Sequence, residues 1–372
     1  MKLAVLPEPL AGIPWRVILP LVILVCFGAT VLHSAAGGSF HPFATSHLVR
    51  FGVFLTMALI IRLMPRELVV MAAYPAYVGV LLLLILVELL GAIGGGSQRW
   101  LDLGFIVLQP SEFMKPVIVL TLATFYGALP PGMTGSWRAL LPAGVLVGLP
   151  MGLVLLQPDL GTALAIGFGA GVLLFLAGLP WKWFAGAGAA ALVIAPIAYF
   201  FALHDYQRAR VTTFLDPESD PLGTGYHITQ SKIAIGSGGI TGKGFGEGSQ
   251  SHLNYLPEPH TDFVFATMAE EWGLVGGLLV LLIFGVILRW GLTVARNAPD
   301  RFSQLLAGGM TATIFFYVAI NLLMVMGLAP VVGIPLPFMS HGGSSMLTNM
   351  ICIGTLMMID RWSQRSRSTS FN

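Results

Sequence analysis

Apolar runs of membrane length are the feature of this sequence that most limits how the chain can fold. About ten such runs, each of roughly 17–25 residues, follow one another along the chain. Helices of this length cross the hydrocarbon core of a bilayer, and a chain with so many of them needs a bilayer as its solvent. The predicted transmembrane helices are residues 16–34, 48–63, 69–91, 112–129, 138–156, 161–179, 182–202, 263–288, 304–327 and 342–359.

Composition agrees with this prediction. The chain is 56% hydrophobic and only 10% charged, whereas soluble domains carry about 25% charged residues. The formal net charge of +2 gives no basic field for nucleic acid, so we expect no nucleic-acid partner. The sequence therefore predicts an all-α integral membrane protein, with residues 1–372 forming a single membrane domain.

Lysine and arginine indicate how the chain is oriented. Most of them fall on one side of the predicted spans, which is the cytoplasmic side by the positive-inside rule, and they are Lys2, Arg16, Arg62, Arg66, Arg138, Lys182, Arg289, Arg296, Arg301, Arg361, Arg365 and Arg367. Both termini are then cytoplasmic. The polar segments after spans three, five, seven and nine, including the long loop 203–262, all lie on the outer face. We therefore expect them to build one composite site there.

The first of these segments runs through residues 94–104 and leads to Glu112 and Lys115. One interpretation is a surface turn followed by a helix that Ser111 caps, with Glu112 at the positive helix end and an ion pair to Lys115. The alternative is a functional site, because charged groups at membrane depth are costly and usually line a cavity.

The second segment, Gln157 to Thr162, contains Pro158, which predicts a turn between two helices. Asp159 follows it, and either caps the next helix or acts as a catalytic acid.

The long loop 203–262 contains two patterned stretches. Residues 225–235 have helical spacing and predict a short interfacial helix. Residues 236–246 are rich in glycine but lack the spacing of a P-loop, because Gly244 follows Lys243 where Ser or Thr is needed. We therefore do not expect nucleotide binding. The stretch is either a flexible linker or a backbone cradle for a phosphate.

The loop ends at Asp262, just before an apolar run. One interpretation is that Asp262 or Thr261 caps that helix, and the alternative is that Asp262 acts as a base at the boundary between water and lipid. The fourth segment, residues 327–345, is apolar but dense in proline and glycine. It cannot form one regular helix, and it predicts a re-entrant or cavity-lining segment.

Together these segments resemble the SEDS family of shape, elongation, division and sporulation proteins, over nearly the whole chain. The elongation (rod-shape) branch looks closer than the division branch. His341 departs from the pattern, since the family usually has tyrosine there. The motifs that carry the resemblance are Arg99-Trp100-Leu101-Asp102-Leu103-Gly104, Gln109-Pro110-Ser111-Glu112, Gln157-Pro158-Asp159-Leu160-Gly161-Thr162, His260-Thr261-Asp262-Phe263, Pro335-Leu336-Pro337 and Ser340-His341-Gly342-Gly343-Ser344.

The resemblance implies a peptidoglycan glycosyltransferase of the cytoplasmic (inner) membrane that polymerises lipid II on the outer face during cell elongation. It also implies a class B penicillin-binding protein and other elongation-complex proteins as partners, besides membrane lipid. Asp262 is the residue that the family motif marks as essential, and we expect it to be the general base of an inverting sugar transfer. The expected substrate-binding residues are Glu112, Lys115, Asp159, Arg50, Arg208, Arg210, Lys232 and Lys243.

Other functions remain open at this stage. A lipid II flippase, a non-catalytic scaffold and a division-type polymerase are alternatives, although we find no inverted repeat of the kind that transporters have. We expect no certain cofactor and no protein metal site, although a divalent cation is possible because adjacent acidic residues could hold one.

Overall fold

The structure is a computed structural model of the whole chain. It describes residues 13–94, 97–102, 107–130, 132–201, 208, 211–214, 216, 224–253, 255, 256 and 258–369.

Within these residues, ten helices of 17 to 33 residues occupy the ten predicted spans. They are α2 (Trp15–Ala35), α3 (Phe43–Ile61), α4 (Arg66–Leu90), α5 (Pro110–Ala128), α6 (Trp137–Leu156), α7 (Leu160–Leu176), α8 (Trp181–Phe201), α12 (Val264–Arg296), α13 (Arg301–Val325) and α14 (Gly343–Thr369). Seven of them are long and apolar enough to cross a membrane, and α7 is a shorter apolar helix. The helical membrane fold is confirmed, while the exact number of spans stays a prediction.

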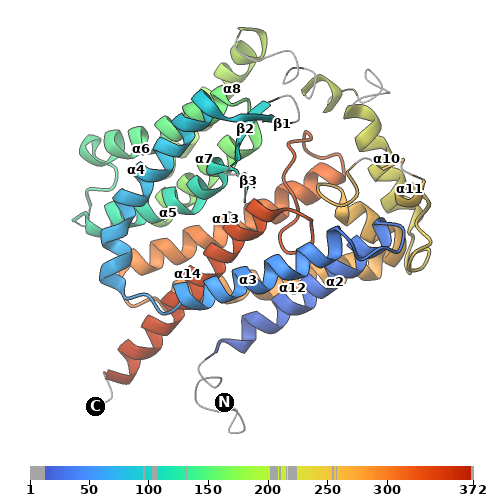
Figure 1. Cartoon of the computed structure of the whole chain (residues 1–372). Helices are drawn as coiled ribbons and strands as arrows, with labels where there is room; N and C mark the ends of the chain where they lie inside the picture. Colours follow the sequence, from blue (N-terminus) through green and yellow to red (C-terminus); the bar gives the residue numbers. More distant parts are fainter. Residues whose placement is uncertain are drawn as a thin grey trace.

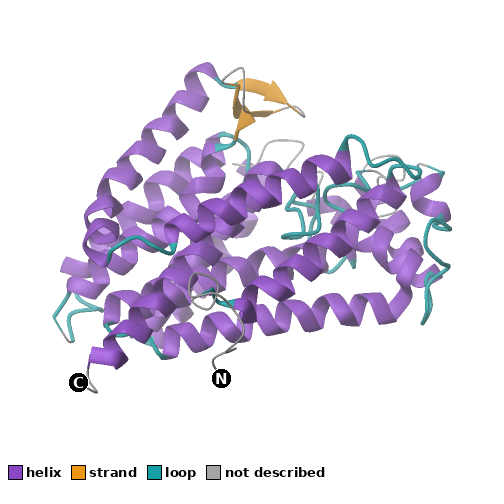
Figure 2. Cartoon of the chain, turned by 60° about the horizontal axis from the view of Figure 1, so that its bottom comes forward, coloured by secondary structure: helices purple, strands orange, loops and turns teal. Residues whose placement is uncertain are grey.

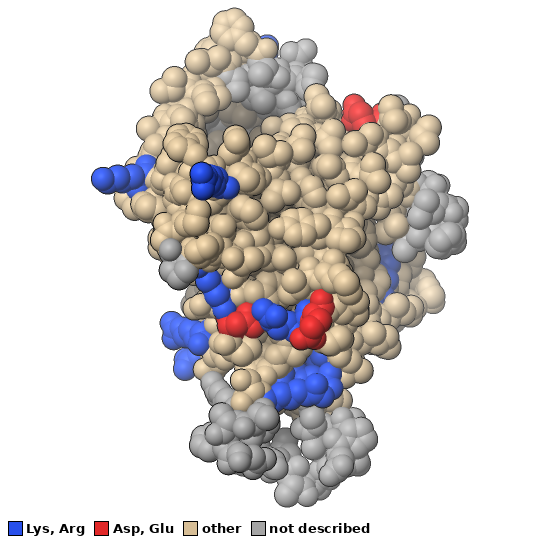
Figure 3. All heavy atoms as spheres, turned by 90° about the vertical axis from the view of Figure 1, so that its left-hand side faces the viewer, with Lys and Arg blue, Asp and Glu red and all other residues tan. Residues whose placement is uncertain are grey.

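Helix α13 is central in the bundle and packs against α12, α7, α5 and α14 (Figure 1). Helices such as α4, α6 and α8 instead turn large apolar side chains outward, and Leu192 on α8 is 79% exposed. On the face in Figure 3, charged side chains gather mainly in the lower part, and the surface above is broadly uncharged. An apolar surface of this extent is expected where lipid is the solvent.

A small antiparallel sheet follows α4 and was not predicted. Strands β1 (Ala92–Gly94), β2 (Ser97–Asp102) and β3 (Val107–Leu108) pair in the order β1-β2-β3. The sheet lies at the edge of the bundle, opposite the C-terminal end of α14 (Figure 2). The prediction of a simple surface turn was therefore wrong at this position. The glycine-rich composition hid a hairpin, because its strands are too short to show a clear alternation.

Several helix boundaries differ from the sequence prediction, among them those of α5, α12 and α14. The cap of α5 is Gln109 rather than Ser111, because Pro110 takes the first helical position, where its missing N–H costs nothing. Helix α14 continues to Thr369, past the predicted end at residue 359. Helix α12 extends to Arg296, and it is interrupted at Gly273, where φ is 62° and ψ is −158°.

The described part of the long loop confirms the short helix and corrects the glycine-rich stretch. Helix α10 (Thr224–Ser237) covers the predicted helical segment, and α11 (Ser249–His252) follows. Residues 238–244 are neither a flexible linker nor a free phosphate cradle. The N–H groups of Lys243 and Gly244 donate to the carbonyls of Glu270 and Glu271 on α12, at 3.0 and 3.1 Å.

Candidate functional site

A cavity of about 820 Å³ lies where the predicted polar segments meet. Each of the four segments contributes to its wall, so the expectation of one composite site agrees with the structure. Helix α3 adds a further wall. The lining residues are Val49, Arg50, Val53, Phe54, Arg99, Trp100, Leu108, Gln109, Glu112, Asp159, Thr162, Thr261, Asp262, Gly333, Ile334, Pro335, His341, Gly342, Gly343, Ser344, Ser345 and Leu347.

Asp262 lies two residues before the first residue of α12, Val264, and lines the cavity. The N-cap position of α12 is Phe263, whose side chain makes no capping hydrogen bond, rather than the predicted Thr261 or Asp262. The backbone of Asp262 is held from α13: Asn321 Nδ2 donates to the Asp262 carbonyl at 2.9 Å and to the Ile334 carbonyl at 2.8 Å. Asn321 thereby ties the end of the long loop to the cavity-lining segment after α13.

Asp159 has two roles at the cavity wall. Its Oδ1 accepts the N–H of Thr162 at 3.1 Å and caps α7, which confirms the capping prediction. Its Oδ2 accepts from Gln109 Nε2 at 3.2 Å. Arg99 donates to the carbonyls of Gln157 and Pro158, so it ties the small sheet to the turn before α7.

Glu112 and Lys115 form the predicted ion pair in the first turns of α5. Lys115 Nζ lies 2.5 Å from Glu112 Oε1, with the lysine side chain only 1% exposed. Tyr317 on α13 completes the group, because it donates to the second carboxylate oxygen of Glu112 and accepts from Lys115 at 2.8 Å. Glu112 lines the cavity while Lys115 lies behind it. A buried charge pair is tolerable only with such complete hydrogen bonding.

Arg50 brings a positive charge to the cavity from α3. Its Nη1 lies 3.1 Å from His341 Nε2, and a guanidinium can only donate, so this imidazole nitrogen must accept. The ring proton is then on Nδ1, which lies 3.5 Å from Ser46 Oγ. Burial, followed by the charge of Arg50, lowers the pKa of His341 below the usual 6.5 and favours this neutral form.

Three of the predicted substrate residues lie elsewhere. Arg208 donates to the Phe200 carbonyl at 2.8 Å. Lys232 is exposed on α10 beside Gly327, and Lys243 is paired with Glu270. Arg210 lies outside the described residues. Of the described residues of loop 203–262, those that reach the cavity wall are Thr261 and Asp262.

Sequence reasoning did not single out several residues that build the site. Tyr317 and Asn321 sit within an apolar run of helical length, where only their polar character marks them. Trp100, Gln109 and His341 stood inside the motifs, but their contribution to one wall depends on the fold. Among the described residues, no group of three or more His, Cys, Asp and Glu side chains is close enough to hold a metal ion.

Residues 11–365 match the model of the FtsW/RodA/SpoVE family of cell cycle proteins. The chain belongs to this family. It is 43% identical to the peptidoglycan glycosyltransferase MrdB of Escherichia coli strain K12 over 345 residues, which is 92% of each chain. The family that the motifs resemble is thus confirmed.

Two solved structures of similar proteins share this fold. One comes from a peptidoglycan synthase complex described for its coordination of polymerization and crosslinking, and it is 33% identical, with a TM-score of 0.82, over 94% of this chain and 98% of that one. The rod shape determining protein RodA of Thermus thermophilus is 31% identical, with a TM-score of 0.71, over 95% of this chain and 98% of that one.

Proposed function

We propose that this chain is a peptidoglycan glycosyltransferase that polymerises lipid II into β-1,4-linked glycan strands on the outer face of the cytoplasmic membrane. Its role in this proposal is cell elongation, with both termini in the cytoplasm. Membership of the FtsW/RodA/SpoVE family and the likeness to MrdB support the reaction. The observation that carries the proposal is the cavity, where the Asp262 carboxylate and the Arg50 cation line one space.

The shape of the cavity suits a lipid-linked sugar. Its polar wall contains Asp262, Asp159 and Glu112, whereas Val49 and Val53 of α3 are 61% and 60% exposed on the apolar surface of the bundle. A substrate with a polar head and a long hydrocarbon tail fits such a boundary, because each part keeps a matching solvent. Arg50 is suited to the pyrophosphate, because guanidinium groups bind phosphate oxygens well.

The proposed reaction is a single displacement at the anomeric carbon of the donor. Asp262 takes the proton from the acceptor 4-hydroxyl as the hydroxyl oxygen forms a bond to the anomeric carbon. The bond from the anomeric carbon to the pyrophosphate oxygen breaks, and the lipid pyrophosphate leaves with the electron pair. One displacement converts an α-linked donor to a β-linked product. Arg50 stabilises the negative charge that develops on the leaving group.

The proposed partner is a class B penicillin-binding protein, which crosslinks the strands. The support comes from the similar chain in a complex that coordinates polymerization with crosslinking. Glu112 and Lys115 already neutralise each other's charge, so we propose that Glu112 forms part of the cavity wall and Lys115 supports it, rather than that both bind the substrate directly.

The test is polymerisation of lipid II by the purified chain with its partner. We expect glycan strands from the wild type and a loss of about 10²–10⁴-fold in rate for Asp262→Asn, which keeps the shape but removes the base. Asp360→Asn on α14 is the matched control and should keep wild-type activity. Thermal unfolding shows whether both variants are folded.

The outcomes separate the alternatives. A folded Asp262→Asn variant with full activity would make the base assignment wrong. If the wild type makes no polymer with its partner but moves lipid II across vesicles, the chain is a flippase. Addition of Mg²⁺ or a chelator to the same assay tests the possible divalent cation.

A further inference from the structure

The interruption of α12 at Gly273 leaves backbone groups without partners inside the helix itself. Residues 264–272, here called the leading segment, are separated by Gly273 from the rest of α12. A helix that stops and restarts frees carbonyls on one side of the break and N–H groups on the other. Glu270, Glu271 and Gly273 are buried, so water cannot easily satisfy these groups.

Residues 238–244, the glycine loop, supply the missing hydrogen bonds on both sides of the break. Lys243 and Gly244 donate their N–H groups to the carbonyls of Glu270 and Glu271. On the other side, Leu274 and Val275 donate to the carbonyls of Gly239 and Ile240, at 2.9 and 3.1 Å. The loop thus connects the two halves of α12 through backbone hydrogen bonds on both sides of the break.

The glycines in this loop are explained by close backbone contact. A Cβ at Gly238 would overlap the carbonyl oxygen of Ala269, and one at Gly242 would overlap that of Glu271. Gly242 and Gly239 also have positive φ angles, of 84° and 56°, which suit glycine. Gly236, by contrast, has nothing within 4 Å of the position of a Cβ.

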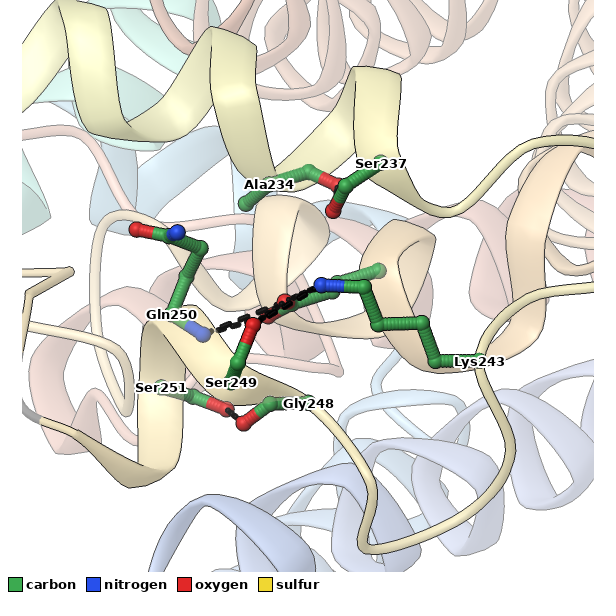
Figure 4. Close-up of polar contacts among 8 residues, drawn as sticks. Ala234, Ser237, Lys243, Gly248, Ser249, Gln250 and Ser251 are labelled. Atoms are coloured by element: carbon green, nitrogen blue, oxygen red, sulfur yellow. Dashed lines mark hydrogen bonds and ion pairs between the residues drawn. The ribbon is translucent and has the colours of Figure 1, made fainter.

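An ion pair between exposed Lys243 and buried Glu270 fixes the loop to the leading segment. Glu270 is fully buried, and its Oε1 lies 2.6 Å from Lys243 Nζ. Ser249 Oγ and the N–H of Gln250 also donate to this carboxylate, both at 3.1 Å. Figure 4 shows Lys243 and Ser249 pointing toward each other from the loop and from α11. Each oxygen of the carboxylate has a donor, which offsets the cost of burying its charge.

We propose that the glycine loop and the Lys243–Glu270 pair are positioning elements that fix the leading segment and, through it, Asp262. The proposal rests on the proposed function of Asp262 as the base. Asp262 lies two residues before this segment, where Asn321 holds its backbone, and the loop holds the other end of the segment. A shift of about 1 Å at a reacting group can cost about 10²-fold in rate.

The first experiment compares two alanine substitutions in lipid II polymerisation. Gly238→Ala adds a Cβ that would overlap the Ala269 carbonyl, so the loop can no longer approach α12 as closely. We expect kcat to fall by about tenfold or more, with KM for lipid II within about twofold of wild type. Gly236→Ala is the matched control, two residues earlier and in open space, and should keep wild-type kinetics. Equal kinetics of the two variants would overturn the proposal.

The second experiment tests the ion pair as a unit. Lys243→Met and Glu270→Gln should each lower kcat, and the double variant should be little worse than either, because one interaction is lost in all three. Lys243→Arg should restore most of the activity. Glu247→Gln, the same substitution at an exposed position of this region, is the control. Additive losses, or no rescue by arginine, would contradict a joint positioning role.

Hydrogen exchange gives a readout that does not depend on catalysis. In Gly238→Ala and Lys243→Met, the amides of Leu274 and Val275 should exchange faster, while those near Ile283 in the same helix stay protected. If the wild type makes no polymer but this exchange pattern holds, the proposed function is wrong, whereas the connection of the two halves of α12 by the glycine loop is supported. Unchanged exchange in both folded variants would show that the glycine loop does not hold the two halves of α12 together, and would overturn the proposal.

Discussion

Two carboxylates lie near the two ends of the leading segment of α12, and their surroundings are opposite. Asp262 is partly exposed and lines an 820 Å³ cavity. Glu270 is fully buried, and a lysine, a serine and a backbone N–H all donate to it. This contrast indicates which of the two carboxylates can act as a general base. A carboxylate that is fully hydrogen-bonded in the core stabilises structure, whereas one that faces a substrate-sized space can take a proton.

Glu112 lies between these extremes, because it lines the cavity and is also paired with Lys115 and Tyr317. Lys115→Met should turn it into an uncompensated buried charge and lower the stability by about 3–5 kcal/mol. Thermal unfolding in detergent measures this change. The double variant Glu112→Gln with Lys115→Met should recover part of the loss, and no recovery would show that the pair is not what Lys115 stabilises.

The position of the Asp262 carboxylate should matter as well as its charge. Asp262→Glu keeps the charge but moves it by one methylene, so we expect a loss of about 10²-fold in kcat. Asp300→Glu on the opposite side of the bundle is a matched control for polymerisation kinetics. If Asp262→Glu is as active as the wild type, the base needs no exact placement and the comparison with Glu270 loses its force.

The support of Asp262 by Asn321 gives a smaller expected effect. Asn321→Leu removes two donors from the carbonyls of Asp262 and Ile334, so we expect kcat to fall about tenfold. The control is Asn349→Leu, because Asn349 bonds only within its own helix to the Ser345 carbonyl. A comparable loss in both variants would point to general destabilisation rather than positioning.

The smallest effect concerns pH. Burial and Arg50 lower the pKa of His341, so neutral His341 contributes stability that is present above about pH 6.5 and is lost as the pH falls below it. A protonated ring also cannot accept from Arg50. The residues around it that are titratable or charged are Arg50, His47, His260, Glu258 and Asp262.

His341→Tyr should therefore move the acidic limb of the rate profile to lower pH, with about a few-fold gain in relative activity near pH 5. The measurement is the polymerisation rate between about pH 5 and 8. His33→Tyr, outside the cavity wall, should leave the profile unchanged. An identical acidic limb in His341→Tyr would show that Asp262 or His260 determines it alone.

Much of the site could be predicted from particular residues. Pro158 predicted the turn, Asp159 the cap, and the spacing of Glu112 and Lys115 their ion pair, because each depends on neighbours within one helical turn. Lys232 and Lys243 were predicted to bind substrate, but the structure places both away from the cavity wall. Charge shows that a residue needs a partner but does not show which one.

The amino-acid sequence alone predicted the apolar segments, the meeting of the polar segments at one site and the family to which the chain belongs. Those properties depend on hydropathy and on local motifs. Only the tertiary structure decided that the glycine loop closes the break at Gly273, and that Asn321 reaches Asp262 from a different helix. These contacts join residues far apart in the chain, and no periodicity of one segment records where another segment will lie.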